Sequence, residues 1–252
     1  MRAISSVLLV SVITLGGCLA TSNQAPPQVR VSRSLNYPFQ QRLLLGASVE
    51  NRPIECIVLG RGEVEVLMLA TIHGNEPAGT PLLRMLGGYL LKNPHLLQAR
   101  RVVLVPVANP DGMSRQTRHN ARGVDLNRNF PAANRQNNSR YGFSALSEPE
   151  SRLIYQLIHQ YEPKRIVTVH EEAGCIDYDG PAREWAAYLA AFCLLPVRRL
   201  GSQPGSLGSY AGTALGLPII TMELAADAEK LDENSLWQCY GAALLAAITY
   251  PN

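Results

Sequence analysis

Residues 64–91 read VEVLMLATIHGNEPAGTPLLRMLGGYLL, and this stretch decides the fold. The apolar run Val64 to Ile72 lacks clean polar alternation, which is typical of a strand that is covered on both faces. A helical pattern follows from Pro77 to Leu91. Between the two lies His73-Gly74-Asn75-Glu76, at the point where the chain leaves the predicted sheet. A strand that leads directly into a helix predicts an α/β fold with polar groups at the strand end.

The same alternation of strands and helices continues along the chain. Short apolar runs predict further buried strands at Ile54 to Leu59, Val102 to Val107, Ile166 to Val169 and Ile219 to Met222. Helical patterns cover Glu148 to Tyr161, Arg183 to Leu195 and Leu236 to Ile248. We therefore predict a single α/β domain with a mixed, mostly parallel sheet flanked by helices.

Two local features refine this picture. Ser147-Glu148-Pro149-Glu150 fits a capping box with proline in the first turn of the helix that follows. The stretch from Asn109 to Ser147 is the longest irregular region, and long loops in a compact domain tend to be functional.

Length and charge limit the classes of function. The chain has 252 residues, which suits one catalytic domain, placed at residues 37–252. The net charge of +3 is small and the Lys and Arg residues are dispersed, so the sequence indicates neither a nucleic-acid surface nor a polybasic membrane patch. Small or polymeric substrates are the expected partners.

The N-terminus indicates export. Met1-Arg2 is positively charged, Ala3 to Leu15 is apolar but too short to span a bilayer, and Leu15-Gly16-Gly17-Cys18 resembles a bacterial lipobox. We predict a lipoprotein signal peptide at residues 1–17, a lipidated Cys18 and a flexible tether at residues 18–36. An ordinary secretory signal that happens to contain cysteine is the alternative.

Such an anchor predicts a location in the bacterial cell envelope. The protein is expected on the periplasmic side, attached to the membrane through its lipid. Leu19 after Cys18 is not the aspartate that retains lipoproteins in the inner membrane, which favours the outer membrane.

The other four cysteines suggest disulfides rather than a metal site. An oxidising envelope allows two bridges among them, and three connectivities remain open. No CxxC pair exists, which argues against cysteine ligation of a metal. These residues are Cys56, Cys175, Cys193 and Cys239.

His73 and Glu76 are candidate metal ligands because residues three apart can meet on one side of a turn. His170 ends the strand Ile166 to Val169, so in a parallel sheet it emerges at the same edge as His73. Two histidines and one glutamate leave a fourth position for water, which is the pattern of catalytic zinc. A solvated turn with a helix-capping glutamate is the simpler alternative. The other histidines, His95, His119 and His159, are predicted to be solvent-exposed.

Three further motifs carry a family resemblance. They are Asn109-Pro110-Asp111-Gly112, Gly123-Val124-Asp125-Leu126-Asn127-Arg128-Asn129-Phe130 and Ser147-Glu148-Pro149-Glu150. In this order after the HxxE motif, from about residue 50 to the end, they resemble the zinc carboxypeptidase family. The resemblance implies a zinc peptidase with its fold, holding one zinc ion per chain.

Two segments resemble the murein peptide amidases of that family. They read HGNEPAG at residues 73–79 and CIDYDGPA at residues 175–182. These enzymes cut between γ-D-glutamate and meso-diaminopimelate, so the resemblance implies a peptidoglycan-derived peptide as substrate. The lipobox is a departure, because that enzyme group is associated with recycling in the cytoplasm.

The motif around Asp125 implies roles for three residues. Asp125 matches the aspartate that hydrogen-bonds the first ligand, His73, although an aspartate that only caps a loop is the alternative. Asn127 and Arg128 match the pair that binds the terminal carboxylate of the substrate, for which the planar arginine fork is well suited.

The resemblance also implies two catalytic residues. Glu223, after the apolar strand that ends at Met222, matches the family's general base, with a solvated strand end as the alternative. Arg118 matches the arginine that polarises the scissile carbonyl, and Arg115 is its rival because the loop is short.

The pocket beyond these residues departs from digestive relatives. Their mobile tyrosine has no counterpart at residues 200–203, so Tyr210 is predicted to line the pocket, and simple packing is equally compatible. Ser206 belongs to a small, mostly polar segment where the family sets side-chain preference. That composition suits a polar, zwitterionic side chain such as diaminopimelate.

Other functions remain open at this point. A general zinc carboxypeptidase would use the same mechanism. An N-acyl-amino-acid deacylase resembling aspartoacylase shares HxxE and the Asn-Arg pair. An inactive cell-wall-binding lipoprotein is the non-enzyme alternative, although all expected ligands and Glu223 are present.

Overall fold

A computed structural model describes residues 39–251 of the chain. The predicted signal peptide at residues 1–17, the lipidated Cys18 and the tether at residues 18–36 all lie outside the described residues.

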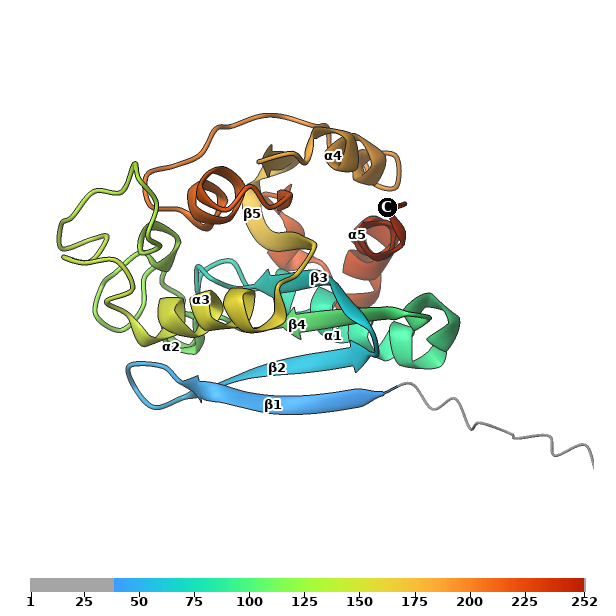
Figure 1. Ribbon diagram of the computed structural model, residues 1–252, viewed down its shortest axis with the longest axis horizontal. Coiled ribbons are helices and arrows are strands. Elements are labelled where there is room, and N and C mark those ends of the chain that lie inside the picture. The colour runs from blue at the N-terminus through green and yellow to red at the C-terminus, as the bar shows by residue number, and fades with distance from the viewer. Residues whose placement is uncertain (1–38, 252) are drawn as a thin grey trace, which may run out of the picture. The chain divides into compact units, whose positions relative to one another are not determined.

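Six strands form one mixed sheet in the order β1-β2-β4-β3-β5-β6 (Figure 1). Strand β2 pairs antiparallel with β1 and β4, whereas β3 pairs parallel with β4 and β5, and β5 begins parallel to β6. This confirms the predicted mixed, mostly parallel sheet. The strands are β1 (Gln40–Ala47), β2 (Pro53–Gly60), β3 (Glu63–Ala70), β4 (Arg100–Val105), β5 (Arg165–Asp179) and β6 (Ile219–Ala225).

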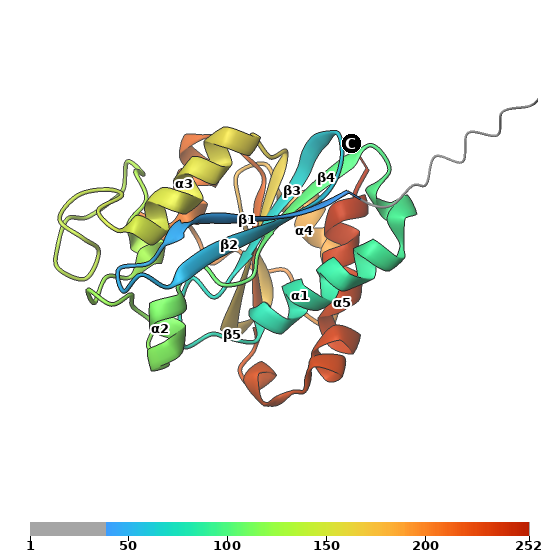
Figure 2. The ribbon, with the colours of Figure 1, turned by 90° about the horizontal axis from the view of Figure 1, so that it is seen from below.

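Helices cover both faces of the sheet (Figures 1 and 2). On one face α1, α4 and α5 bury their apolar sides in a core that we call the α1-side core. On the other face α3 and the short helix η3 contribute to the α3-side core. The main helices are α1 (Gly79–Lys92), α2 (Pro110–Arg115), α3 (Pro149–Tyr161), α4 (Arg183–Ala190) and α5 (Glu233–Thr249), and the short ones are η1 (Pro94–Leu97), η2 (Leu126–Arg128), η3 (Gly208–Ala214) and η4 (Ala228–Lys230).

The apolar residues of β3 face both cores. Val66 and Met68 belong to the α1-side core, and Leu67 and Leu69 belong to the α3-side core. Successive side chains of a strand point to opposite faces, so a strand covered on both sides needs no polar positions. The absence of alternation therefore predicted this strand correctly.

Strand β1 was not predicted from the sequence. It is an edge strand, and most of its residues are exposed or half-buried. Such a strand buries too little apolar surface to carry a hydrophobic pattern that sequence analysis can detect.

Strand β5 is longer than predicted because the chain reverses within it. The first part of β5 runs parallel to β6, from Ile166 opposite Ile219 to Glu172 opposite Ala225. The second part runs back along β6 in the opposite direction, from Cys175 opposite Glu223 to Asp179 opposite Ile219. The turn uses positive φ angles at Glu172 and Gly174. We call residues 175–179 the return segment.

The predicted capping box does not form. Helix α3 begins with Pro149 in its first turn, as expected, but no side chain caps its N-terminus. The Ser147 hydroxyl donates instead to Glu148 at 2.8 Å. Glu150 accepts hydrogen bonds from the backbone of Val49 and the side chain of Asn120. Both glutamates fasten neighbouring loops rather than the helix end.

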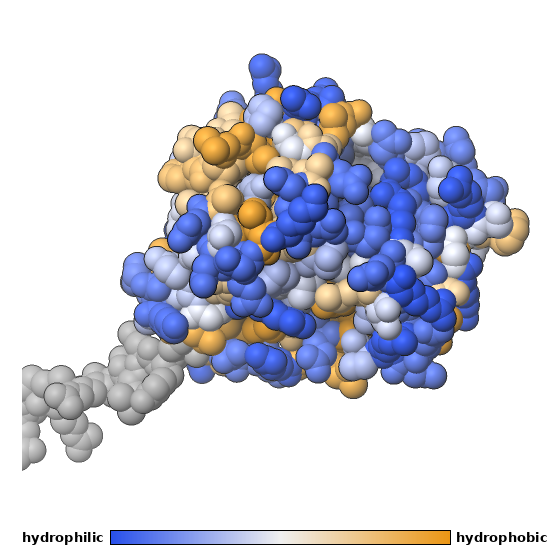
Figure 3. Space-filling view, turned by 180° about the vertical axis from the view of Figure 1, so that it is seen from behind, coloured by the Kyte–Doolittle hydropathy of each residue, from blue (hydrophilic) through white to orange (hydrophobic). Residues whose placement is uncertain are grey.

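The helix predicted from Arg183 to Leu195 ends at Ala190. Several exposed apolar side chains follow it, including Phe192 and Leu194. Figure 3 shows hydrophobic groups gathered over this end of the molecule. Within residues 39–251, no helix is both long enough and apolar enough to cross a membrane.

The four cysteines of the described part are free thiols in this structure. Cys56 and Cys175 are buried, Cys193 is half-buried and Cys239 is exposed. None of the three connectivities left open by the sequence is formed among them.

Gly79 allows the start of α1 to pack closely against the sheet. A Cβ atom there would come within 2.8 Å of the Ala70 Cβ and 2.9 Å of a Val169 methyl. We expect Gly79→Ala to lower the free energy of unfolding by about 1–3 kcal/mol, because the helix must move away from the strands.

Gly88→Ala on the same helix is the matched control. A Cβ at Gly88 meets no atom within 4 Å, so we expect it to stabilise the helix by about 0.5–1 kcal/mol. Urea denaturation followed by circular dichroism measures both changes. Equal stability of Gly79→Ala and the unsubstituted protein would contradict this account of the helix position.

Candidate active site

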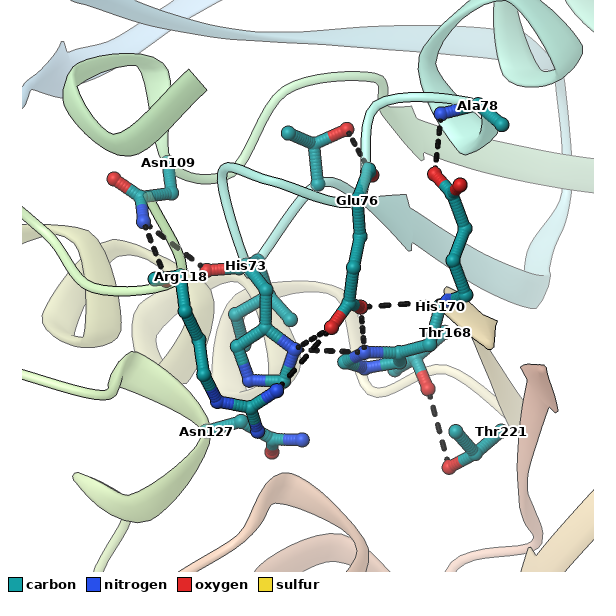
Figure 4. Close-up of polar contacts among 12 residues, drawn as sticks. His73, Glu76, Ala78, Asn109, Arg118, Asn127, Thr168, His170 and Thr221 are labelled. Carbon is teal, nitrogen blue, oxygen red and sulfur yellow. Dashed lines mark hydrogen bonds and ion pairs between the residues drawn. The ribbon is translucent and has the colours of Figure 1, made fainter. Parts of the chain in front are cut away.

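The candidate site lies at the carboxyl ends of β3 and β6, close to the point where β5 turns back. Ala70 pairs with Val169, so the residues that follow these two positions emerge side by side. His73 and Glu76 lie in the loop between β3 and α1, and His170 directly follows Val169 (Figure 4). The fold therefore brings together the three residues that the sequence predicted as metal ligands.

The loop that carries His73 depends on two unusual backbone positions. Thr71 adopts a positive φ of 53°, and its hydroxyl lies 2.7 Å from that of Thr80 on α1. A Cβ at Gly74 would come 1.9 Å from the carbonyl carbon of Gly112. Only glycine allows this loop to touch α2, which fixes the HxxE turn against that helix.

The three donors converge on one point. The Nδ1 atoms of His73 and His170 each lie 2.8 Å from an oxygen of Glu76, and they are 3.1 Å from each other. All three residues are at most 5% exposed, and their ligand atoms lie within 4.8 Å of one another. Two imidazole nitrogens that face each other across a carboxylate fit zinc, which prefers this set of nitrogen and oxygen ligands.

Hydrogen bonds within the site shift the pKa values of Glu76 and His73. Burial opposes ionisation of Glu76, but hydrogen bonds from His170 and His73 outweigh it and lower the pKa of this carboxyl. Burial likewise lowers the pKa of His73, but hydrogen bonds with Asp125 and Glu76 outweigh it and raise that pKa overall. Glu76 is therefore an ionised carboxylate, the form in which it binds metal.

Asp125 contacts His73 on the ring nitrogen that does not face Glu76. Its Oδ1 lies 3.1 Å from His73 Nε2, and it also accepts from the backbone N–H of Asn127 at 3.0 Å. A proton kept on Nε2 by Asp125 would leave the lone pair of Nδ1 available to a metal ion. Asp125 therefore orients the imidazole and also caps η2, so it fills both of the roles that the sequence left open.

The structure separates the two candidate arginines. Arg118 donates from Nε to Asp125 at 2.9 Å and from Nη1 to Glu76 at 3.3 Å, and it lines the pocket. Arg115 forms an ion pair with Glu50 at the surface and lies outside the pocket lining. Only Arg118 is placed to reach a group bound beside the metal site.

Asn127, Arg128 and Ser206 form one wall of the pocket. Asn127 Oδ1 accepts from the backbone N–H of Leu207 at 2.9 Å, and Arg128 donates to the Asn127 carbonyl at 2.6 Å. Ser206 Oγ accepts from the Ser209 N–H at 3.0 Å. These contacts join the η2 segment to the segment that precedes η3.

Glu223 lies on β6 directly opposite His170 in the strand register. It is half-buried and lines the same pocket. Burial raises the pKa of its carboxyl; the positive charge of His170 opposes this and the negative charge of Glu76 adds to it. Its carboxyl group therefore lies beside the metal site and outside the ligand set.

Tyr210 does not line the pocket, so the prediction that it does is wrong. Its hydroxyl lies 2.7 Å from His159 Nε2 on α3, and its ring stacks with Phe130 and Tyr155. The residue is 5% exposed, in the α3-side core. Packing, the alternative considered for the sequence, accounts for its position.

The remaining histidines are mostly as predicted. His95 and His159 are exposed, whereas His119 is half-buried beside Arg118. Burial lowers the pKa of His119.

Several pocket residues were not singled out from the sequence. Glu171 accepts from the Ala78 N–H at 2.6 Å, and its burial raises its pKa to about 7. Asp177 and Asp179 also line the pocket, as does Thr221. The alternation Cys175-Ile176-Asp177-Tyr178-Asp179 is the signal that would have identified the two aspartates, because it predicts a strand with one polar face.

The chain is similar to known proteins in sequence as well as in fold. A family model described as zinc carboxypeptidase matches residues 32–181. Murein peptide amidase A of Escherichia coli K12 is 37% identical over 175 residues, which cover 62% of this chain and 69% of that protein. Carboxypeptidase Z of Homo sapiens is 36% identical over 118 residues, or 39% of this chain and 18% of that protein.

Solved structures agree with the fold. Murein-tripeptide amidase MpaA from Escherichia coli O157 superimposes with a TM-score of 0.65 at 28% sequence identity. The match covers 84% of this chain and 93% of the MpaA chain. Bovine thrombin-activatable fibrinolysis inhibitor, solved with a tick carboxypeptidase inhibitor, has a TM-score of 0.71 at 18% identity. The match covers 83% of this chain and 88% of the inhibitor chain. At 18% identity this likeness shows the fold alone.

The contact between Asp125 and His73 predicts an effect on metal affinity. Asp125→Asn keeps the shape of the side chain but removes the charge that orients the imidazole, so we expect zinc affinity to fall by about 10- to 100-fold. Competition with a chromophoric chelator measures the affinity, and thermal unfolding checks that the variant is folded. A folded variant with unchanged affinity would show that Asp125 only caps the loop.

Proposed function

The chain belongs to the zinc carboxypeptidase family and is a zinc metallopeptidase, and from that premise we propose that it hydrolyses the amide bond between γ-D-glutamate and diaminopimelate in cell-wall peptides. The observation that carries this proposal is the convergence of His73, Glu76 and His170, with Glu223 opposite His170 on the next strand. Three protein ligands leave a coordination position open, which is typical of catalytic zinc.

Glu223 acts as the general base in this proposal. Zinc held by His73, Glu76 and His170 supplies Lewis-acid chemistry, which activates water at neutral pH and stabilises negative charge on a carbonyl oxygen. The Glu223 carboxylate accepts a proton from the attacking water and delivers it to the departing amine. The C–N bond of the amide then breaks as a carboxylate forms, and no serine or cysteine nucleophile is required.

Arginine side chains orient the substrate. Arg118 donates hydrogen bonds to the scissile carbonyl oxygen as negative charge develops there. Asn127 and Arg128 bind the terminal carboxylate, for which the guanidinium fork provides two parallel hydrogen bonds. The placement of all three residues along the pocket supports these roles.

The composition of the pocket supports a polar substrate residue. Ser206, Gln203 and Gly208 line it beside the carboxylates of Asp177 and Asp179. A Cβ atom at Gly208 would come 2.2 Å from an Asp179 oxygen, so a side chain at this position would displace the carboxylate. The likeness to a protein named murein peptide amidase A supports diaminopimelate as that residue.

The proposal includes an anchor in the cell envelope. The signal peptide at residues 1–17 is removed, Cys18 carries the lipid, and the tether at residues 18–36 holds the catalytic domain on the periplasmic side. Leu19 favours the outer membrane. The support for this part is the N-terminal sequence pattern alone.

The general base is tested with Glu223→Gln. We expect the purified variant to keep about one zinc per chain and to lose about 10²- to 10⁴-fold in kcat on L-Ala-γ-D-Glu-diaminopimelate, because the amide accepts no proton. Glu229→Gln, which changes an exposed glutamate, is the control. Release of diaminopimelate is measured by chromatography, with ordinary dipeptides as comparison substrates. Full activity of Glu223→Gln would show that another group is the base.

The anchor is tested in cells with Cys18→Ser. We expect the unsubstituted protein to incorporate labelled palmitate and to sediment with outer membranes, and the variant to lose the label. If the unsubstituted protein carries no label and is recovered in the soluble periplasmic fraction, the N-terminus is an ordinary secretory signal instead.

A further inference from the structure

The segment that follows α4 exposes several apolar side chains close together. Leu194 is fully exposed at 101%, Phe192 is 43% exposed and Leu200 is 49% exposed. Val197, which lies between them, is 37% exposed. Single exposed apolar residues are common on soluble proteins, but a group of them marks a surface that binds another molecule. We call residues 192–200 the apolar tip.

The apolar tip is fastened to the domain from within. Leu195 is 6% exposed and packs in the α1-side core. The Pro196 carbonyl accepts from the Ile176 N–H on the return segment at 2.9 Å, and the Arg198 N–H donates to the Ile176 carbonyl at 3.0 Å. The side chains of the tip, Leu194 above all, therefore project from a segment whose backbone is held in place.

Positive charge adjoins these apolar side chains. Arg198 and Arg199 belong to the tip and are exposed, and residues 191–200 contain no aspartate or glutamate. Neither arginine forms an ion pair within residues 39–251. A guanidinium group binds phosphate oxygens through parallel hydrogen bonds. Apolar side chains beside arginines match the boundary between the acyl chains and the anionic headgroups of a bilayer.

A protein partner matches this surface less well. The centre of a protein–protein interface is apolar and depleted of charged residues, which lie at its rim. In the apolar tip, Arg198 and Arg199 lie between Val197 and Leu200 in the sequence, so charge and apolar groups are interleaved. Interleaving of this kind suits a bilayer surface, where phosphates and acyl chains are both within reach of one short segment.

The length of chain before the described residues supplies a second argument. In the proposed anchor, residues 18–38 connect the lipid on Cys18 to Phe39. A chain of this length spans up to about 70 Å when it is extended, so the anchor alone lets any face of the domain meet the membrane. It also keeps the domain at a high effective concentration near the lipids, so a weak contact is sufficient to select one face.

We infer that the apolar tip docks on the surface of an anionic phospholipid bilayer. Phe192 and Leu194 enter the edge of the acyl-chain region, and Arg198 and Arg199 bind lipid phosphates. The inference rests on the proposed anchor, which brings the domain to the membrane. Leu200 belongs to the tip and also lines the pocket with the metal site, so the docked domain holds that pocket beside the membrane surface.

The depth of the tip is measured with tryptophan fluorescence. The full lipidated protein is placed in vesicles of phosphatidylethanolamine and phosphatidylglycerol, with and without bromine on the acyl chains. We expect the indole added by Leu194→Trp to be quenched at least about twofold by the brominated lipids, after subtraction of the unsubstituted protein's signal. Phe143→Trp, which replaces an apolar side chain that is 76% exposed in the loop before α3, is the matched control and should not be quenched. Equal quenching of the two variants would overturn the inference.

The role of the arginines is tested in the same vesicles. We expect Arg198→Gln with Arg199→Gln, added to Leu194→Trp, to lower the ratio of docked to undocked protein by about 30-fold, since each arginine near an anionic surface contributes about fivefold. Arg42→Gln with Arg84→Gln removes the same charge at two exposed positions on β1 and α1, and it should leave the quenching unchanged. Equal losses from the two pairs would show that only the net charge of the domain matters, against the inference.

Other occupants of the tip give different results. If the emission of Leu194→Trp shifts with protein concentration in the absence of vesicles, a second copy of the chain covers the tip and the inference is wrong. If Leu194→Trp fails to fold, Phe192→Trp provides the same measurement from the neighbouring exposed side chain.

Failure of the tip is distinguishable from failure of the anchor. A protein that carries the lipid and sediments with vesicles, but shows no quenching at residue 194, refutes the docked tip and leaves the anchor in place. A protein that carries no lipid and stays in solution refutes the proposed anchor, and the inference fails with it.

Discussion

The carboxylate of Glu76 lies between two buried imidazole rings, and the rest of the site depends on this contact. Glu76 comes from the loop after β3 and His170 from β5, so the contact requires that these two strands be neighbours in the correct register. A slip of one residue would turn the side chains of β5 to the other face of the sheet. The two cores on either side of β3 and β5 exclude such a slip, because each strand contributes apolar side chains to both.

Contacts from other elements hold the ligands in place. Asp125 fixes His73, Glu171 fastens the start of α1 to β5 through the Ala78 N–H, and Asn109 donates to the Ile72 carbonyl at 3.2 Å. Each contact joins segments that are distant in sequence. Metal ligands on irregular loops need such support, since small displacements of a donor weaken binding. The long loops between β4 and α3 therefore serve the site directly, as their length suggested.

Residue patterns predicted the parts of the fold that are governed by burial and spacing. The apolar run of β3, the HxxE turn after it and His170 at the end of another strand were sufficient to place three donors at one sheet edge. Edge strand β1 was missed because it is exposed, and the reversal at Glu172 was missed because a positive φ at a non-glycine residue leaves no mark in sequence. The choice between Arg118 and Arg115 depended on Glu50, and the position of Tyr210 on His159, both of which are distant in sequence.

The most direct measurement is an anomalous-scattering map at the zinc edge from crystals grown with zinc. The account predicts one peak about 2.0–2.2 Å from the Nδ1 atoms of His73 and His170 and from the carboxylate of Glu76. A peak at the cysteine thiols, or a His170 ring turned away from the other two donors, would contradict it.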